Sequence, residues 1–314
     1  MEQSIKKCIS IVTPTYNEEL NVEQLYVEVK AVMATLHDYH YEHIFIDNAS
    51  TDSTVVILKK LAVQDTNVKI IVNIKNFGHI RSPYYGMQQA HGDAVILMAA
   101  DLQDPPTMII EFVTRWEQGN AIVVGVKNES QENPLMFMVR KWYYHLINKF
   151  SEIPQIKNFT GFGLYDQTFI SILRTVREPY PYFRGLVSEL GFGRVEVPYV
   201  QPARKKGISH NNFYTLYDIA MLGFVNHSKV PLRMASFIGF GMSVVSFLVG
   251  TVYLIYKLLF WDRFQAGLAP LTIGLFLFSS IQLFFIGIVG EYIGAIYTQV
   301  KDRPLVVEKE RINF

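Results

Sequence analysis

The sequence of 314 residues predicts an α/β fold, in which a mostly parallel sheet with flanking helices is followed by a C-terminal pair of transmembrane helices. Two observations predict this fold class. Short apolar or β-branched runs alternate with segments of helix length as far as Gly125, and two long stretches near the C-terminus carry no charged side chain. Alternating strands and helices are typical of parallel sheets, and apolar stretches of this length can cross a bilayer.

The strands are predicted from five runs bounded by polar or turn-forming residues: Ile9–Pro14, His43–Asp47, Val68–Val72, Ala94–Ala99 and Ala121–Gly125. Between the first two runs, apolar residues recur at the spacing of an amphipathic helix: Val22, Leu25, Tyr26, Val29, Val32, Met33 and Leu36. Segments of helix length also separate the other runs, so right-handed βαβ crossovers are the economical connections.

Composition excludes several classes of protein. The formal net charge of +1 lacks the basic excess of a nucleic-acid-binding protein, so no nucleic-acid partner is expected. The chain is too long for one small core, and two or more structural units are expected. Cys8 is the only cysteine, which excludes an internal disulfide and a cysteine metal cluster and favours a reducing compartment.

The transmembrane helices are predicted at about residues 232–258 and 267–297. Basic residues precede the first span and follow the second, whereas the connection between the spans is nearly neutral. The basic residues are Lys229 and Arg233 at the first span, and Lys301, Arg303, Lys309 and Arg311 after the second. By the positive-inside rule, both ends of the pair face the cytoplasm. The polar start of the chain is unlike a secretory signal, so the N-terminal part is also expected in the cytosol. A buried core helix is the alternative to each span.

The expected organisation is a cytosolic catalytic domain over residues 1–212, an interfacial helix and connection over 213–231, and the two spans with a cytosolic tail over 232–314. Amphipathic patterns at 135–151 and 213–224 carry aromatic residues, and the first also carries basic residues. We expect both to form interfacial helices that lie against lipid headgroups. Packing on the sheet is the alternative, and the pattern alone leaves it open.

The most informative run is 91–106, in which an apolar strand is followed by Asp101, Gln103 and Asp104 in a loop that two prolines close. In open α/β sheets, ligands bind beyond the carboxyl ends of the strands. Carboxylate and amide oxygens suit a hard divalent cation that bridges phosphate oxygens. The alternative is a turn that caps the next helix, with Asp104 as the N-cap residue.

Other predicted strands also end in polar clusters, which are Thr13–Glu19, Asp47–Asp52 and Asn76–His79. The ring of Tyr16 can stack on a nucleobase, and carboxylates can accept hydrogen bonds from a base edge or from ribose. Singly, such residues are more typical of turns and helix caps. Because several strand ends carry them, we expect the polar side chains to converge on one rim of the sheet.

Other binding motifs can be dismissed. The sequence contains no glycine-rich fingerprint of a dinucleotide-binding fold and no P-loop. His37, His40 and His43 could suggest a metal cluster, but they lie in a polar connection before a strand, and metal ligation is not expected there.

Together, the motifs resemble those of the family-2 glycosyltransferases. They are similar, more narrowly, to the polyprenyl-phosphate type, which includes bactoprenol glucosyltransferases and dolichol-phosphate mannose synthases. The motifs are Pro14-Thr-Tyr-Asn-Glu-Glu19, Ser50-Thr-Asp52, Asn76-Phe-Gly78, Asp101-Leu-Gln-Asp-Pro-Pro106 and, in the paired transmembrane tail, Gly290-Glu-Tyr-Ile-Gly294. The resemblance covers nearly the whole chain and implies a GT-A-like catalytic domain.

The resemblance also implies roles for individual residues. The nucleotide sugar would contact Pro14, Tyr16, Glu18, Asp47, Ser50, Asn76, Gly78 and Lys127. Mg²⁺ or Mn²⁺ on the diphosphate would be held by Asp101 and Gln103, and the catalytic residues would be Asp101, Asp104, Arg184 and Arg204. The acceptor phosphate would bind Arg204, Ser209 and His210 in a basic loop, for which a solvated charge run is the alternative.

Two departures from the family pattern stand out. The family often has D-A-D-L-Q, but Ala99 replaces the first acid here, which leaves Asp101 as the only carboxylate of that pair. Many members carry G-D-F-R-L, whose Asp is a candidate base, whereas this chain reads Thr160-Gly-Phe-Gly-Leu164. In addition, His210 stands where a Lys usually follows the loop serine.

A missing base is compatible with a phosphate nucleophile. A sugar hydroxyl needs a base, but a lipid phosphate has its second pKa at about 6 and is largely ionised at neutral pH. The acceptor can therefore attack without deprotonation, and a single displacement inverts the anomeric centre.

The sequence therefore predicts a membrane-anchored enzyme on the cytosolic face of a bacterial inner membrane. It would transfer a hexose, in the simplest case glucose from UDP-glucose, to undecaprenyl phosphate or a similar polyprenyl phosphate. The alternatives are a processive polysaccharide synthase and a membrane scaffold or flippase partner with a degraded transferase fold. Homo-oligomerisation stays open.

Overall fold

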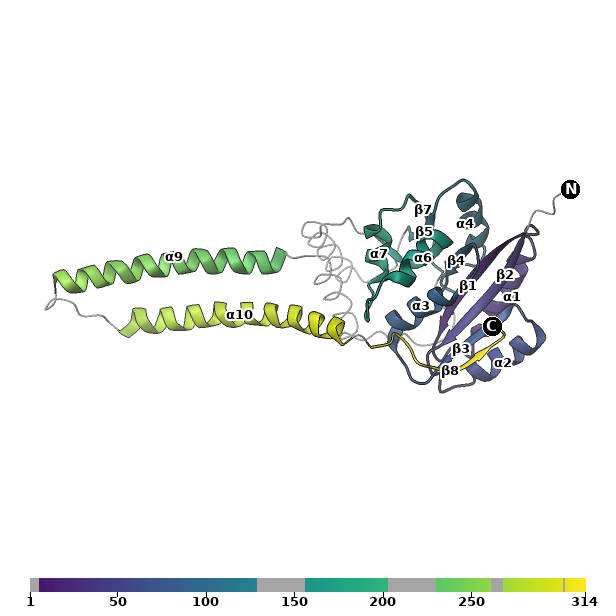
Figure 1. Ribbon diagram of the computed structural model, residues 1–314, viewed down its shortest axis with the longest axis horizontal. Helices are drawn as coiled ribbons and strands as arrows, with labels where there is room; N and C mark the ends of the chain where they lie inside the picture. Colours follow the sequence, from purple (N-terminus) through teal and green to yellow (C-terminus); the bar gives the residue numbers. More distant parts are fainter. Residues whose placement is uncertain (1–5, 129–155, 203–229, 261–267, 302) are drawn as a thin grey trace.

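The computed structural model describes residues 6–128, 156–202, 230–260, 268–301 and 303–314. They form a rounded α/β domain from which two long helices project side by side (Figure 1). The domain is built on an eight-stranded sheet with the strand order β7-β5-β6-β4-β1-β2-β3-β8. The strands are β1 (Lys7–Thr15), β2 (Tyr39–Asp47), β3 (Val68–Asn73), β4 (Ala94–Leu97), β5 (Ile122–Lys127), β6 (Phe159–Asp166), β7 (Arg194–Tyr199) and β8 (Glu308–Ile312).

The sheet is mixed but mostly parallel, as the sequence predicts. β1 runs parallel to β2 and β4, β2 to β3, and β5 to β7. β6 is antiparallel to both of its neighbours, β4 and β5, and β8 is antiparallel to β3 at the edge. The parallel strands therefore end together at one edge, where polar residues of the following loops can meet.

Helices cover both faces of the sheet. The core on one face includes side chains of α1 (Val22–Met33), α2 (Thr54–Gln64) and α4 (Met108–Glu117). The core on the other face includes side chains of α3 (Gly78–Gln89), α6 (Gln167–Thr175) and α7 (Phe183–Glu189). The central strands are apolar on both sides because they lie between these two layers; Ile9, Ile11 and Val12 of β1 have no exposed area.

The periodicity in the first half of the chain corresponds to the observed elements. The residues of the predicted amphipathic stripe on α1 are buried, with Leu36 packed at its margin. All five predicted strands are present, although β4 ends at Leu97 rather than at Ala99. The chain therefore turns into the acidic loop earlier than the apolar run suggests.

The crossover connections do not all join neighbouring strands. β1 and β2 lie between β4 and β3, and β6, which the sequence did not predict, lies between β4 and β5. β6 was missed because its sequence contains Gly161 and Gly163, and glycine is depleted in strands. The register pairs Leu97 with Gly163, which brings this segment beside the acidic loop that follows β4.

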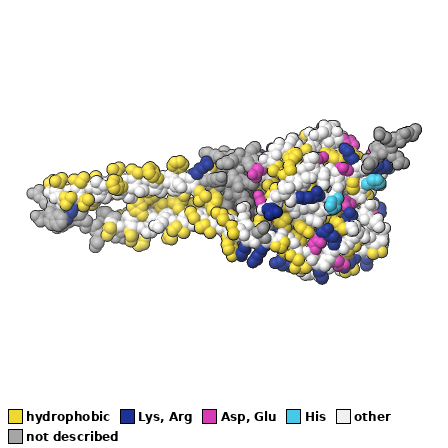
Figure 2. Space-filling view, viewed as in Figure 1, with side chains coloured by type: hydrophobic (Ala, Val, Ile, Leu, Met, Phe, Trp, Pro, Cys, Tyr) yellow, Lys and Arg dark blue, Asp and Glu magenta, His cyan; other side chains and the backbone are white. Residues whose placement is uncertain are grey.

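The C-terminal region forms the expected pair of long helices, α9 (Val230–Leu259) and α10 (Leu268–Val300). Their candidate spans are Leu232–Leu259 and Ile273–Val300, with a mean hydropathy of 2.0 and 2.1. Neither span has buried residues in its most apolar window, and hydrophobic side chains cover the surface of both helices (Figure 2). The alternative of core helices is therefore excluded, because a core helix would be enclosed by this domain.

The residues after α10 return to the domain. Ile74 N donates a hydrogen bond to the carbonyl of Val307 at 3.1 Å, and β8 then continues the sheet beyond β3. The start of α9 and the end of α10 both lie at the end of the helix pair that faces the domain (Figure 1). The two predicted interfacial helices, over 135–151 and 213–224, lie outside the described residues.

A buried histidine makes the stability of the domain depend on pH. His43 on β2 has no exposed area; its Nε2 lies 3.0 Å from Thr13 Oγ1, and its ring centroid lies 4.0 Å from that of Phe45. Burial lowers the pKa of the imidazole to about 3, so the ring is neutral in the folded state. The unfolded chain binds a proton here near pH 6.5, so stability is lost as the pH falls below that value.

Between pH 7 and pH 5, His43 is expected to lower the free energy of unfolding by about 2 kcal/mol. Urea unfolding of the detergent-solubilised protein at both pH values measures this loss. The His43→Gln variant keeps a polar partner for Thr13 but does not titrate, so it should lose about 2 kcal/mol less over the same interval. An equal loss in both proteins would contradict the assignment.

Candidate functional site

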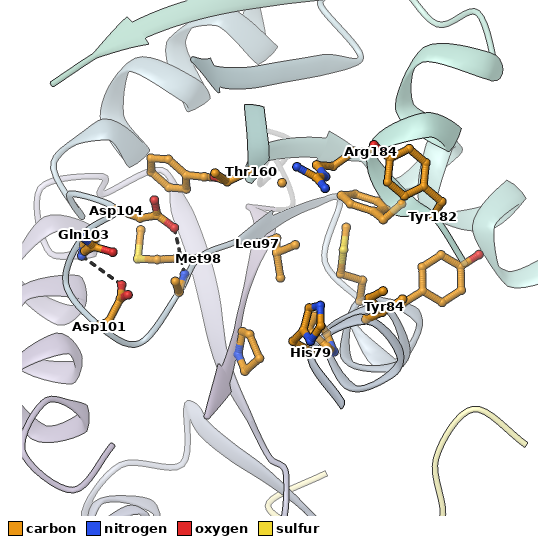
Figure 3. A pocket seen from close by; sticks show the side chains of 18 of the residues that line it. His79, Tyr84, Leu97, Met98, Asp101, Gln103, Asp104, Thr160, Tyr182 and Arg184 are labelled. Atoms are coloured by element: carbon orange, nitrogen blue, oxygen red, sulfur yellow. Dashed lines mark hydrogen bonds between the residues drawn. The ribbon is translucent and has the colours of Figure 1, made fainter. Parts of the chain in front are cut away.

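A cavity of about 380 Å³ lies at the carboxyl ends of β1 and β4. Pro14 lines it from β1, and Leu97 from β4. Further walls come from the loop after β4, from α3, and from the start of α7 (Figure 3). The position agrees with the general rule that ligands of open α/β sheets bind outside the carboxyl ends of the strands.

One end of the cavity is acidic. Asp101, Gln103 and Asp104 all line it, on the loop that follows β4. Leu102 has a positive φ of 59°, and this kink turns the loop so that its neighbours face the cavity. The backbone N–H of Gln103 donates to Asp101 Oδ1 at 3.2 Å, which fixes the carboxylate of Asp101.

Asp104 holds the acidic loop in place from within. Its Oδ2 accepts a hydrogen bond from the backbone N–H of Ala99 at 3.1 Å, and its Oδ1 accepts one from Tyr199 Oη at 3.1 Å. Burial raises the pKa of the Asp104 carboxyl to about 6, and the nearby charge of Asp101 adds to the increase. Asp104 thus ties the loop to β7.

The other end of the cavity is cationic. Arg184 lines it from the first turn of α7, with its guanidinium carbon 5.4 Å from the ring centroid of Tyr182. Arg184 Nη1 donates to the carbonyl of Phe159 at 3.4 Å. His79 from α3 lies on the facing wall (Figure 3), and burial together with the charge of Arg184 lowers the pKa of its imidazole. Lys127 at the end of β5 is a further cation in the lining.

A second set of predicted residues lies at neighbouring strand ends but does not line the cavity. Asp47 is buried, and its carboxylate accepts hydrogen bonds from the backbone N–H of Ser50 at 2.9 Å and from Ser50 Oγ at 2.5 Å. Burial raises the pKa of Asp47. Asn17 N donates to Ser50 Oγ at 2.9 Å, which joins the loop after β1 to the loop after β2.

The loop after β3 joins the same rim. Asn48 Nδ2 donates to Asn76 Oδ1 at 2.8 Å and to the carbonyl of Gly78 at 3.2 Å. The backbone N–H of Phe77 in turn donates to Asn48 Oδ1 at 2.8 Å. The loops after β1, β2 and β3 therefore form one hydrogen-bonded rim, as the clustered strand ends predicted.

The predicted site residues thus fall into three groups. Those that line the cavity are Pro14, Asp101, Gln103, Asp104, Lys127 and Arg184. Those at the adjoining strand ends are Tyr16, Glu18, Asp47, Ser50, Asn76 and Gly78. Those outside the described residues are Arg204, Ser209 and His210.

Several lining residues were not assigned a role from the sequence. They include His79, Tyr84, Thr160, Tyr182 and Gln201. His79 follows the Asn76-Phe-Gly motif, and Tyr182 lies two residues before Arg184, to which the family resemblance gives a catalytic role. Tyr84 carries no local signal, because its place in the lining depends on the packing of α3 against β1, β2 and α6.

Local backbone geometry explains why both Gly161 and Gly163 are glycines in the segment Thr160-Gly-Phe-Gly-Leu164. Gly161 has a φ of +107°, a conformation that side chains with a Cβ rarely adopt. At Gly163, an added Cβ would lie 2.5 Å from the backbone oxygen of Val123 on β5. The backbone conformation therefore favours glycine at both positions, where many family members carry an acid and an arginine.

The acidic end fits a divalent cation. In the part of the chain that the structure describes, Asp101 Oδ2 and the amide oxygen of Gln103 accept no hydrogen bond, and Gln103 Nε2 donates to the carbonyl of Pro202 at 3.5 Å. Mg²⁺ and Mn²⁺ prefer such oxygen ligands. No group of three His, Cys, Asp or Glu side chains is gathered within these described residues, so substrate oxygens and water would have to complete the coordination.

The fold and the site together define a glycosyltransferase. The glycosyl transferase family 2 model matches residues 10–177, and the GtrB C-terminal hairpin model matches residues 231–296. The chain belongs to glycosyl transferase family 2.

Relatives match along nearly the whole chain. The SfII prophage-derived bactoprenol glucosyl transferase of Shigella flexneri is 33% identical over 303 residues, which are 96% of this chain and 97% of that protein. The glycosyltransferase YkcC of Bacillus subtilis is 35% identical over 299 residues, 95% of this chain and 92% of its own length.

A solved structure has the same fold. It is the glucosyl-3-phosphoglycerate synthase of Mycobacterium tuberculosis, determined in complex with Mn²⁺, UDP and phosphoglyceric acid. It is 15% identical and superimposes with a TM-score of 0.50, covering 70% of this chain and 76% of its own. At this identity the likeness supports the GT-A-like fold of the domain.

Proposed function

We propose that this glycosyltransferase moves a hexose, in the simplest case glucose from UDP-glucose, to a polyprenyl phosphate at the cytosolic face of a membrane. The observation that carries the proposal is a cavity with an acidic end and a cationic end in a domain joined to a membrane hairpin. Relatives named as bactoprenol glucosyl transferases, which match over nearly their full length, favour this acceptor and this sugar.

The acidic end would hold the donor. Asp101 and Gln103 would bind Mg²⁺ or Mn²⁺, which would neutralise charge on the diphosphate as it leaves. The loops after β1, β2 and β3 carry the residues proposed to contact the nucleotide, among them Tyr16 for stacking on the base. Asp47 braces this rim through Ser50, so in the described conformation its contribution to nucleotide binding is indirect.

The cationic end would hold the acceptor phosphate. Arg184 presents a planar fork of N–H donors that matches phosphate oxygens. Two anions must approach each other for the transfer, so cations between them lower their repulsion. Arg204, Ser209 and His210 are proposed to complete this phosphate site.

The proposed reaction needs no general base. A phosphate monoester with its second pKa at about 6 is ionised at neutral pH, so its oxygen can attack the anomeric carbon directly. Gly161 stands where a family acid would be, and it supplies no proton acceptor. A single in-line displacement breaks the bond to the diphosphate and forms the new glycosidic bond, so the product has the inverted configuration.

The hairpin would place the site beside the lipid. The start of α9 and the end of α10 face the domain, and the basic residues Arg233, Lys301 and Arg303 lie at these ends. The positive-inside rule assigns such ends to the cytoplasm. A soluble nucleotide sugar could then meet an acceptor whose phosphate stays at the headgroup level.

A panel assay tests the proposal. Membranes that contain the chain are given undecaprenyl phosphate and, in turn, labelled nucleotide sugars, and the extracted lipid is analysed. Lipid-linked glucose from UDP-glucose, in the anomeric configuration opposite to that of the donor, is the expected product. Undecaprenol without its phosphate serves as the control acceptor and should receive no sugar.

Other outcomes point to the alternatives. A labelled product from a different donor would keep the class of reaction and change the sugar. If no donor gives lipid-linked sugar and the purified protein binds no UDP in the presence of Mn²⁺, the chain is a scaffold with a degraded transferase fold, for which Ala99, Gly161 and Gly163 are the supporting residues.

A further inference from the structure

Helix α3 lies between the cavity and the C-terminal strand. His79, Ile80, Pro83, Tyr84 and Met87 form the cavity wall from one side of the helix. At 100° per residue these positions share one face, whereas Tyr85 and Gln89 lie on the opposite face. A shift of α3 perpendicular to its own axis would therefore change the shape of the cavity.

The opposite face of α3 is bound by β8. Tyr85 Oη donates to Glu308 Oε1 at 2.8 Å, and Arg311 Nη2 donates to Gln89 Oε1 at 2.8 Å. Arg311 also pairs with Glu308, with Nε 2.9 Å from Oε2. These contacts form one network of side chains, the α3–β8 network, which consists of Tyr85, Gln89, Glu308 and Arg311.

The ionisation of Glu308 follows from this network. Burial alone would raise the pKa of its carboxyl, but the hydrogen bonds from Arg311 and Tyr85 outweigh that effect and hold the pKa below its ordinary value. Burial and the contact with Glu308 in turn raise the pKa of Tyr85 to about 12, so its hydroxyl stays protonated and can donate. The network is therefore formed throughout the neutral pH range.

The same strand is continuous with the membrane hairpin. Residues 301–304 connect the end of α10 to Leu305, which packs on the core below α3, and to Val306, which is 6% exposed. Asn313 Nδ2 anchors the far end of the strand on the carbonyls of Ala62 and Val68 at 2.8 and 2.9 Å. The second span is thus followed, within a few residues, by a segment that packs on the domain and contacts α3.

Helix α3 needs external support. Pro83 lies inside it, has no N–H to donate to the carbonyl of His79, and places its ring against that carbonyl. The first turn, which carries His79 into the cavity, is therefore weakly held by the helix itself. Tyr84 Oη and Gln88 Nε2 donate to the carbonyl of Leu173 at 3.0 and 2.9 Å, and β8 supplies the contacts on the other side.

We propose that Glu308 and Arg311 are positioning residues, which hold α3 through Tyr85 and Gln89 and thereby couple the membrane hairpin to the cavity wall. This inference rests on the proposed transfer reaction at the cavity. None of the four residues lines the cavity, so the network acts on the substrates through the placement of α3.

The test compares single substitutions in the full-length protein. Tyr85→Phe removes only the hydroxyl that donates to Glu308, and Glu308→Gln removes the charge that pairs with Arg311. Lys59→Gln is the matched control, because it breaks the 2.5 Å pair between β8 and α2 through Glu310, and no α2 residue lines the cavity. Amide hydrogen exchange over residues 78–89 reports on α3, and kcat for glucose transfer to undecaprenyl phosphate reports on the site.

Tyr85→Phe and Glu308→Gln are each expected to speed exchange in α3 and to lower kcat about tenfold, with UDP binding unchanged. The double variant should resemble the single ones, because both remove the same interaction. Lys59→Gln should change neither exchange in α3 nor kcat. Unchanged exchange in α3, or faster exchange with wild-type kcat, would overturn the inference. If the wild-type protein transfers no hexose at all, the proposed function fails, while exchange in α3 still decides whether the network holds the helix.

Discussion

Replacing Asp101 by alanine is expected to lower kcat for hexose transfer by about a thousandfold. Asp101 carries the one carboxylate at the acidic end with an oxygen that accepts no hydrogen bond among the described residues, since both oxygens of Asp104 are bonded, one to Ala99 and one to Tyr199. Ala99 offers no second acid, so no neighbouring residue of the motif can replace the lost charge. The measurement is kcat with UDP-glucose and undecaprenyl phosphate in the presence of Mn²⁺.

Asp101→Asn separates the charge from the shape of the loop. The asparagine oxygen can still accept the hydrogen bond from the backbone N–H of Gln103, so the turn is retained while the negative charge is lost. Both variants should fold as the wild type does and should bind UDP less tightly with Mn²⁺. Wild-type turnover in either variant would show that Asp101 does not support the leaving group.

Introducing arginine at Gly163, as in many family members, is expected to unfold the domain rather than to restore a missing function. An added Cβ would lie 2.5 Å from the backbone oxygen of Val123 and 3.1 Å from the Cα of Val124, and neither backbone atom can move without disturbing the pairing of β5 with β6. Even Gly163→Ala should lower the free energy of unfolding by about 3 kcal/mol. Denaturant unfolding of the solubilised protein measures the loss.

Gly193→Ala is the matched control for this prediction. No heavy atom lies within 4 Å of a Cβ built at Gly193, so the substitution should leave the free energy of unfolding almost unchanged. Equal stability of the Gly163→Ala and Gly193→Ala variants would contradict the packing described for β6. The absence of the family arginine at Gly163 is therefore not an isolated loss of one side chain. The surrounding backbone of β5 also differs, because it leaves no room for a side chain there.

Much of the fold could be predicted because its signals are local. β1 to β5 are continuous apolar runs between helices, and the spans are long uncharged stretches, so periodicity and length were sufficient. β6, β7 and β8 were missed, and the reasons for β6 and β8 differ. Glycines lower the strand signal of β6, and β8 has the charged sequence Glu308-Lys-Glu-Arg-Ile312, whose place at a sheet edge depends on contacts with β3 and α3.

The candidate site could be predicted only in part. The acidic loop was found because an apolar strand followed by acids and prolines is distinctive. The roles of Arg184 and Lys127 came from the family resemblance, since single basic residues carry no signal by themselves. The sequence could not show that the Asp47 carboxylate turns inward to Ser50, because a strand end fixes where a residue lies but not which way its side chain points.

The pairing of β8 with β3 also determines where the last residue of the chain is found. Phe314 lies against Lys69 and Arg311 at the border of the sheet, with ring-to-cation distances of 5.2 and 4.6 Å. A fluorescent reporter attached after this residue would lie beside the globular domain, and it would be in the same cellular compartment as that domain. Its signal in intact cells would therefore reveal the orientation of the whole molecule.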